Sequence, residues 1–225
     1  MSKDFYDKTY YGKIIPEKVK ISPRKIYENE FYKGLVNPKL GEKLLDLGCG
    51  GGLFLVSLED TGAELWGIDI SGNAVDIAKK LVNKPERILC EKADPLPFDN
   101  EEFDYVTAWG VVEHLTDTTS MLKEIRRVLK EKGKAFIMVP NTYYYKFVWD
   151  TLRKGSGPVR HQEIEYLYSH GEWRNLIEAS GFRILKTHKH NKFNKKRFVI
   201  WMRNKFIPFY FSNHFIFICK KTAEL

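Results

Sequence analysis

Leu44-Leu45-Asp46-Leu47-Gly48-Cys49-Gly50-Gly51-Gly52, followed by Glu64-Leu65-Trp66-Gly67-Ile68-Asp69, decides the fold of this chain. An apolar run that contains an acid breaks into closely spaced glycines, and a second apolar run ends in an acid about 20 residues later. Glycine lets the backbone approach a ligand closely, and a strand–turn–helix loop of this kind presents bare N–H groups to it. An acid that closes the next strand is placed to hydrogen-bond a ribose diol. We therefore expect a ligand with an adenosine-like sugar, the alternatives being a glycine turn without a ligand and a plain helix-capping acid at Asp69.

The spacing of these glycines distinguishes between nucleotide ligands. The dinucleotide fingerprint is G-x-G-x-x-G, whereas Gly48, Gly50 and Gly52 form the pattern G-x-G-x-G. Asp46 stands two residues before the first glycine, where its carboxylate would repel a pyrophosphate and suit a ligand with a cationic end. The loop therefore disfavours an NAD-dependent oxidoreductase, which remains the other enzyme alternative.

Several motifs that follow in order resemble those of the class I S-adenosylmethionine-dependent methyltransferases. The stretch around Asp46 resembles their first motif, (L/V)-L-D-(L/V)-G-C-G-x-G. The later motifs are Leu96-Pro97-Phe98 with Phe103-Asp104, Val112-Glu113-His114-Leu115, Ile125-Arg126-Arg127-Val128-Leu129-Lys130 and Val139-Pro140-Asn141. The resemblance covers residues 40–142 well and 171–190 weakly. Within the family it points to the methyltransferase type 11, ubiquinone-methyltransferase-like branch that acts on small molecules.

The resemblance implies both a fold and a cofactor. The fold is an α/β, Rossmann-like sheet of seven mostly parallel strands with helices on both faces and strand seven antiparallel. The cofactor is S-adenosyl-L-methionine, which leaves as S-adenosyl-L-homocysteine, and no metal is required. Carried over by position, the cofactor-binding residues are Asp46, Gly48, Gly50, Gly52, Asp69, Ile70, Ala93, Asp94 and Trp109.

Two of these positions leave alternatives open. Asp94, with Ala93, is favoured to accept a hydrogen bond from the adenine amino group, and a solvated loop acid is the alternative. Alignment without a gap puts Lys92 there instead, and an ammonium cannot accept a hydrogen bond. Trp109 ends an expected strand, where it either lines the cofactor pocket or fills the core.

The methyl acceptor is expected just beyond the same strand. A sulfonium methyl group is already activated, so orienting the acceptor and excluding water dominate the chemistry. His114 follows the strand at the carboxyl edge, where open α/β sheets bind ligands, and can take a proton near neutral pH. A histidine that only packs is the alternative. Tyr143 and Tyr144 are expected to line the acceptor pocket with His161, and His161 and His170 are rival bases.

Apolar periodicity and turn residues predict the order of the elements. Residues 1–39 are expected to form a cover that is helical after Pro23, and residues 40–225 the methyltransferase domain, with a lid insert over 141–168 and a basic-aromatic insert over 189–211. Strands are expected over 43–47, 63–69, 87–91, 103–109, 134–139, 182–187 and 213–220. Helices are expected over 52–60, 71–83, 118–130 and 172–180, the second of them capped by Ser71.

Composition limits the compartment and the partners. The formal net charge is +8, yet residues 179–223 contain no Asp or Glu, so the excess positive charge lies near the C-terminus. No run reaches the ~18 apolar residues of a membrane-spanning helix, and we expect no signal peptide. The three cysteines share no metal-like or redox spacing. Cytoplasm is the expected compartment.

The insert 189–211 interleaves basic and aromatic residues and leaves three interpretations open. It suits peripheral contact with an anionic membrane, where polybasic attraction and buried rings add. It equally suits nucleic acid, where cations meet phosphates and rings stack on bases. It is also compatible with a plain helix between strands six and seven that has a basic solvent face.

The sequence therefore predicts S-adenosylmethionine-dependent methyl transfer, by in-line displacement, to a small-molecule or lipid-like acceptor, with oxygen favoured over carbon on the basis of His114. An RNA methyltransferase and a catalytically silent S-adenosylmethionine-binding protein are the alternatives. Nucleic acid is the lesser expectation because the chain has neither an Asn/Asp-Pro-Pro-Tyr motif after strand four nor a cysteine nucleophile nearby. We expect a monomer or a weak dimer.

Overall fold

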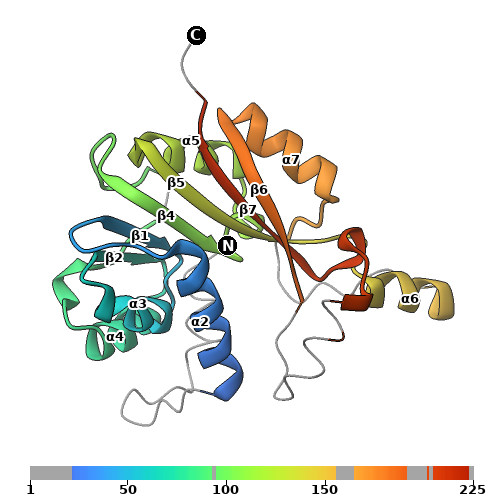
Figure 1. Cartoon of the computed structure of the whole chain (residues 1–225), viewed down its shortest axis with the longest axis horizontal. Coiled ribbons are helices and arrows are strands. Elements are labelled where there is room, and N and C mark those ends of the chain that lie inside the picture. The colour runs from blue at the N-terminus through green and yellow to red at the C-terminus, as the bar shows by residue number, and fades with distance from the viewer. Residues whose placement is uncertain (1–21, 93–94, 156–164, 192–201, 203–204, 223–225) are drawn as a thin grey trace.

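The computed structural model describes residues 22–92, 95–155, 165–191, 202 and 205–222 (Figure 1). Its strands are β1 (Lys43–Leu47), β2 (Glu64–Asp69), β3 (Ile88–Cys90), β4 (Phe103–Trp109), β5 (Leu129–Pro140), β6 (Phe182–His190) and β7 (His214–Lys221). Its α-helices are α2 (Pro23–Val36), α3 (Leu53–Leu58), α4 (Gly72–Leu81), α5 (Thr118–Val128), α6 (Tyr145–Lys154) and α7 (His170–Ala179). The described residues thus alternate strands and helices along most of the chain.

The strands form one seven-stranded sheet in the order β3-β2-β1-β4-β5-β7-β6. Neighbouring strands from β3 to β5 pair in parallel, whereas β7 pairs antiparallel with both β5 and β6. The strand order reverses direction between β1 and β4, and open sheets bind ligands beyond the carboxyl ends of the strands at such a point. The predicted Rossmann-like sheet with an antiparallel strand seven is confirmed.

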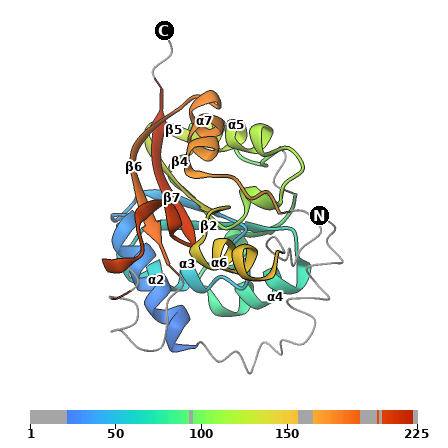
Figure 2. The same cartoon turned by 90° about the vertical axis from the view of Figure 1, so that its right-hand side faces the viewer.

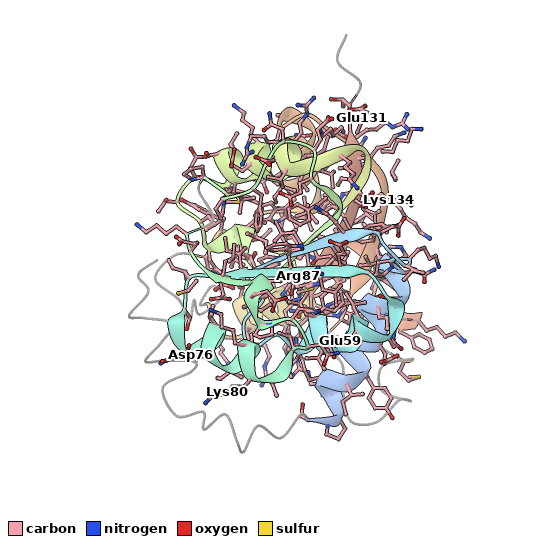
Figure 3. The ribbon with its side chains drawn as sticks, turned by 90° about the vertical axis from the view of Figure 1, so that its left-hand side faces the viewer. Glu59, Asp76, Lys80, Arg87, Glu131 and Lys134 are labelled. Carbon is pink, nitrogen blue, oxygen red and sulfur yellow. The ribbon has the colours of Figure 1, made fainter. Side chains whose placement is uncertain are left out.

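Helices cover both faces of the sheet (Figures 1 and 2). Tyr32 of α2, Phe54 of α3 and Val75 of α4 belong to the core on one face. Ile125 of α5 and Trp173 of α7 belong to the core on the other face. The outer side of α4 carries the charged Asp76 and Lys80, which point away from the sheet (Figure 3). Each of these helices therefore contributes apolar side chains to one of the two cores.

Alternation along β1 and β4 brings polar side chains to one face of the sheet. Leu45 and Leu47 pack into the core beneath α5 and α7, so Asp46 points to the opposite face, beneath α2 and α3. Val106 and Ala108 likewise point toward α5, which leaves Thr107 on the same side as Asp46. The period of two along a strand thus aims the predicted cofactor acid at the face that α2 and α3 cover.

Helix α2 is the N-terminal cover that the sequence predicts after Pro23. The Ser22 hydroxyl accepts a hydrogen bond from the Lys25 backbone N–H, and Asn37 in a left-handed conformation ends the helix. The side-chain amide of Asn29 in α2 donates a hydrogen bond of 2.8 Å to the Leu53 carbonyl at the start of α3. Residues 1–21 lie outside the described residues, and the division of the chain at residue 40 stays a prediction.

Several predicted boundaries are wrong, and the causes lie in tertiary pairing. The helix predicted over 118–130 ends at Val128, because Leu129 already pairs with Phe103 as the first residue of β5. Strand β5 is therefore much longer than the predicted 134–139, and β6 extends past Thr187 because its later residues pair with β7. The Ser71 cap of α4 is confirmed.

The two inserts differ from expectation or lie partly outside the described residues. The lid insert predicted over 141–168 contains α6, a helix that the sequence analysis did not predict although its apolar residues recur at helical spacing. Its residues 156–164, and most of the insert 189–211, lie outside the described residues. Among the described residues, no helix is long and apolar enough to cross a membrane.

Candidate functional site

A cavity of about 250 Å³ opens at the carboxyl ends of β1 and β4. It lies where the strand order reverses, between the glycine-rich turn after β1 and the last residue of β4. Its lining residues are Lys25, Asp46, Gly48, Cys49, Gly50, Gly51, Leu53, Phe54, Ile77 and Trp109. The position is the one at which α/β sheets bind nucleotides.

Close packing explains two of the glycines in the turn after β1. Gly48 has a φ of +66°, and a Cβ there would lie 2.5 Å from the Val111 side chain that follows β4. Gly52 has a φ of +74°, and a Cβ there would lie 3.2 Å from the Ala78 Cα in α4. Gly52 is buried and does not line the cavity, so its bare Cα serves the packing of α4 against the turn.

Asp69, at the end of β2, organises the turn through both carboxylate oxygens. One accepts from the Gly50 backbone N–H at 2.8 Å, and the other accepts from the Ser71 backbone N–H at 2.9 Å. The side chain is half-buried, and a carboxylate offers about four lone-pair sites. The structural role is established, and the ribose contact stays a prediction.

Asp46 is a fully buried carboxyl in the wall of the cavity. The Thr107 hydroxyl donates to its Oδ1 at 2.7 Å. Burial raises the pKa of Asp46 to about 7, although the Thr107 hydrogen bond and the Lys25 charge act in the opposite direction. Lys25 of α2 lines the same cavity, so a carboxyl and an ammonium approach one space from two elements.

Trp109 ends β4 and forms the aromatic wall of the cavity. Its ring stacks on Tyr32 of α2 with centroids 4.1 Å apart, and Phe54 of α3 meets it edge-on at 5.5 Å. The indole N–H is buried and has no hydrogen-bond partner among the described residues. Trp109 therefore packs against the core and also lines the cavity, and its contact with the cofactor stays a prediction.

A second buried acid lies just past β4, next to the predicted base. Glu113 and His114 belong to the 3₁₀ turn Val112–His114, and both are buried. The Glu113 Oε1 lies 3.7 Å from the His114 Nε2, and the Glu113 Oε2 has no hydrogen-bond partner among the residues that the structure describes. Burial raises the pKa of Glu113 to about 8. Because a Cβ on Gly110 would lie 3.4 Å from Oε1, the carboxyl sits against the backbone that follows Trp109.

Comparison with known proteins identifies the family to which this site belongs. A domain family described as "Methyltransferase domain" matches residues 45–137, which include the glycine turn, Asp69 and the Glu113–His114 turn. The chain belongs to the class I S-adenosylmethionine-dependent methyltransferases. Its cofactor is S-adenosylmethionine.

Sequence relatives of this methyltransferase cover part of its length. A ubiquinone biosynthesis O-methyltransferase of Coxiella burnetii is 29% identical over 157 residues, which are 64% of this chain and 65% of that protein. An uncharacterised protein of Methanocaldococcus jannaschii, MJ1252, is 34% identical over 68% of this chain and 57% of its own length. The chain thus spans less than two thirds of the length of these curated relatives.

Solved structures share the fold of the methyltransferase over almost its whole length. The partner of the Trm112 methyltransferase activator in a Haloferax volcanii complex has a TM-score of 0.74 at 20% identity, and covers 100% of this chain and 99% of its own. Phosphoethanolamine N-methyltransferase 2 of Haemonchus contortus, bound to phosphomonomethylethanolamine and S-adenosylhomocysteine, has a TM-score of 0.68 at 20% identity. It covers 99% of this chain and 61% of its own, and at this identity the likeness concerns the fold alone.

The residues of the cavity fit the cofactor. A Cβ at Gly48 would collide with Val111, so the turn keeps its backbone bare beside the cavity. The buried Trp109 N–H, without a partner in the described residues, is a hydrogen-bond donor available to a ligand. Asp46 is a buried carboxyl that forms no ion pair with the described residues, and such a group favours a cationic ligand over a pyrophosphate.

The structure brings only some of the predicted site residues together. Asp46, Gly48, Gly50 and Trp109 line one cavity, whereas Gly52 lies behind it. Ile70 follows Asp69 and accepts a long hydrogen bond from the Cys90 thiol at 3.9 Å. Ala93, Asp94 and His161 lie outside the described residues, and their predicted contacts stay predictions.

The predicted acceptor tyrosines occupy different environments. Tyr143 is exposed, whereas Tyr144 is buried and its ring meets Tyr145 and Phe147 edge-on. Neither lines the described cavity. His170, the rival base, is enclosed by four aromatic rings of the chain near β7, and burial lowers its pKa. The assignment of these residues to acceptor binding stays a prediction.

Sequence reasoning missed Lys25 and the apolar cavity wall formed by Leu53, Phe54 and Ile77. One signal was available for Lys25. The buried residues of α2 are Asn29, Tyr32 and Val36, and Lys25 precedes Asn29 by one helical turn on the same face. Spacing alone could therefore direct Lys25 toward the protein interior, but it could not indicate which element α2 would cover.

Proposed function

We propose that this methyltransferase moves the methyl group of S-adenosylmethionine to an oxygen atom of a small-molecule or lipid-like acceptor. The observation that carries the proposal is the cavity at the reversal of the strand order, with Asp46, Lys25 and a bare glycine turn in its wall and His114 just past β4. The relative from Coxiella burnetii named a ubiquinone biosynthesis O-methyltransferase supports oxygen over carbon.

Opposite charges in the cavity suit the two charged groups at the amino-acid end of the cofactor. Lys25 can pair with the cofactor carboxylate, and Asp46 can pair with the cofactor ammonium. Opposite charges attract strongly here because solvent and salt screen a partly buried site poorly. The Lys25 Nζ also lies 3.3 Å from the Glu28 Oε2 in an i,i+3 ion pair on α2. Asp69 is assigned to the ribose diol and the Trp109 N–H to a polar atom of the ligand.

The bound cofactor supplies a methyl group activated by its sulfonium, so the protein has to orient the acceptor and exclude water. Trp109, Phe54 and Tyr32 form an aromatic wall that keeps this side of the cavity apolar. His114 takes the proton that the acceptor hydroxyl loses as its oxygen bonds the methyl carbon. The carboxyl of Glu113 beside it stabilises the imidazolium when ionised.

Thermal unfolding with different ligands tests the cofactor role of the cavity. A ligand at 100 times its dissociation constant adds about 2.7 kcal/mol, which raises the midpoint of this chain by roughly 5–10 °C. We expect S-adenosylmethionine and S-adenosylhomocysteine to produce this shift, and NAD and NADP to produce none. A shift with NAD alone would overturn the proposal.

Transfer of a tritiated methyl group to a panel of phenols, catechols, sugars and lipid extracts tests the acceptor. We expect label in an O-methyl product. His114→Asn should lower kcat about 100-fold or more with little change in S-adenosylhomocysteine affinity. His188→Asn, on β6, is the matched control and should retain activity. Label only in a C-methyl or nucleic-acid product would replace the oxygen assignment.

A further inference from the structure

Helix α6 leaves an apolar face open to solvent. Trp149 and Leu152 lie about one turn apart on one side of the helix, with the half-buried Val148 beside them, and the structure buries none of the ten residues of α6. Trp149 is 59% exposed and Leu152 is 77% exposed. A short helix of this kind normally needs an apolar partner for its stripe, and none of the described elements covers this one.

A second exposed apolar group lies in residues 205–211. Phe206 and Tyr210 are each 62% exposed, and Phe211 is also exposed. Between them Phe209 turns inward, with ring centroids 5.2 Å from His170 and 5.3 Å from Phe215. This inward ring fixes the segment to the protein, so the outward rings are held at the surface.

The two groups lie at one end of the molecule. The Asn141 side-chain amide, just before α6, donates to the Tyr210 and Ser212 carbonyls at 2.8 Å each. Figure 1 places α6 beside the turn Phe209–Phe211, at the end of the sheet farthest from β2, and Figure 2 shows both on the side that faces the viewer. We call α6 with residues 205–211 the aromatic end.

Cations accompany the rings of the aromatic end. Helix α6 carries three cations, Lys146, Arg153 and Lys154, and a single acid, Asp150. The Asp150 carboxylate pairs with Lys154 at 3.1 Å. Residues 205–211 carry Lys205 and no acid. Leu40, by contrast, is an exposed apolar side chain that stands singly in a loop, next to Lys39 and near Glu42.

The combination of exposed rings and positive charge distinguishes between a lipid surface and a second copy of the chain as the partner of the aromatic end. Tryptophan, tyrosine and phenylalanine rings prefer the boundary between hydrocarbon and water, and cations beside them are attracted to anionic headgroups. A second copy of the chain would bring the same positive surface against itself, because a symmetric dimer pairs identical patches. The positive charge therefore favours a lipid surface over self-association.

We propose that the aromatic end docks on an anionic lipid bilayer, with the apolar face of α6 and the outward rings of residues 205–211 inserted at the headgroup level. The surface lies beyond the carboxyl end of β5, on the edge of the sheet that carries the cofactor cavity. Docking here would leave that edge of the sheet near the membrane. The inference does not depend on the proposed acceptor.

Vesicle co-sedimentation of the full chain tests the proposal. We expect binding to vesicles of phosphatidylcholine with about 30% phosphatidylglycerol at low salt, and weaker binding to phosphatidylcholine alone or at high salt. Trp149→Ser and Phe206→Ser should each weaken binding about tenfold. Lys146→Glu should weaken it on the anionic vesicles alone. Leu40→Ser, at a site more exposed than either ring, is the control and should bind as the parent protein does.

Two further measurements separate this proposal from its competitors. Light scattering without vesicles should show the same mass for the parent protein and the Trp149→Ser variant; a dimer that this variant dissolves would assign the surface to a second copy. The thermal shift with S-adenosylhomocysteine should be unchanged in every variant, which shows that each one folds. Absence of vesicle binding at low salt, or equal binding by parent and ring variants, would overturn the proposal whatever the cofactor result.

Discussion

The two edges of the sheet differ in how their carboxyl groups are paired. At the amino edge of β4, Glu124 of α5 faces the Arg127 guanidinium, whose Nε and Nη2 donate to its two oxygens at 2.8 and 2.9 Å. At the carboxyl edge, Asp46 and Glu113 are fully buried, and no Lys or Arg of the described chain forms an ion pair with either. The pKa of Glu124 is lowered by Arg127, whereas burial raises the pKa of the other two to about 7 and about 8.

The difference between the two edges shows where the chain carries carboxyl groups that lower the stability of its fold. The arginine that pairs with the Glu124 carboxylate also holds the loop before β4 to α5, because Arg127 donates to the Leu96 and Phe98 carbonyls. A buried carboxyl without a cation lowers stability as it ionises, so its presence at two neighbouring positions needs another explanation. Groups of this kind cluster where ligands or protons are handled. We therefore propose the carboxyl edge as the functional edge.

Removing the cation at the amino edge should have the largest effect. Arg127→Leu leaves Glu124 partly buried without its partner and removes the hydrogen bonds to two loop carbonyls. We expect a loss of about 3 kcal/mol in the free energy of unfolding, measured with urea. The double variant with Glu124→Leu should recover part of the loss. A loss below about 0.5 kcal/mol would show that the amino edge is not a stabilising network.

Neutralising a carboxyl at the functional edge should change stability in a pH-dependent way. The folded pKa of Glu113 is raised to about 8 from an ordinary value of 4.5, so the folded state binds more protons between these values. Its contribution to stability is present at low pH and is lost as pH rises toward 8. Glu113→Gln should therefore gain about 2 kcal/mol relative to the parent at pH 8 and little at pH 5, measured by urea unfolding. Equal pH dependence in both proteins would mean that Glu113 is ionised and solvated.

Neutralising the cavity acid should change ligand binding. We expect Asp46→Asn to weaken S-adenosylmethionine binding about tenfold, which is about 1.4 kcal/mol, by calorimetry at pH 8. Because the folded pKa of Asp46 is about 7, the parent should bind the cationic cofactor more tightly as pH rises from 6 to 8, and the variant should lose this trend. Asp60→Asn, at an exposed pair with Lys33, is the control. An unchanged affinity in Asp46→Asn would show that the Asp46 carboxylate does not contribute to cofactor binding.

The smallest effect is expected at a pair that belongs to neither edge network. Arg174 and Glu178 form an exposed i,i+4 pair on α7 at 3.0 Å. Arg174→Ala should change the free energy of unfolding by about 0.3–0.5 kcal/mol, and less at high salt. A loss as large as that of Arg127→Leu would mean that pairing, irrespective of burial and loop contacts, explains the amino edge.

The turn around Gly48 and the acid Asp69 were predictable because their constraints are local. A bare backbone, an acid at a strand end and a serine cap leave a pattern in consecutive residues. Strands β1 and β4 were predicted with correct bounds for the same reason. The start of β5 at Leu129 and the helix α6 were missed, because pairing with a distant strand and packing at a distant surface leave a weaker local signal.

The sequence by itself determined the order of the strands, the cofactor family and the positions of the acids Asp46 and Asp69, since these follow from period, spacing and residue type. Only the tertiary structure decided that Lys25 of α2 faces Asp46 across one cavity, that Gly52 serves packing instead of lining it, and that Glu113 is buried without a cation. Burial, charge pairing and the approach of side chains from different elements depend on distances between residues far apart in the chain. Those distances exist only once the sheet and its helices have assembled.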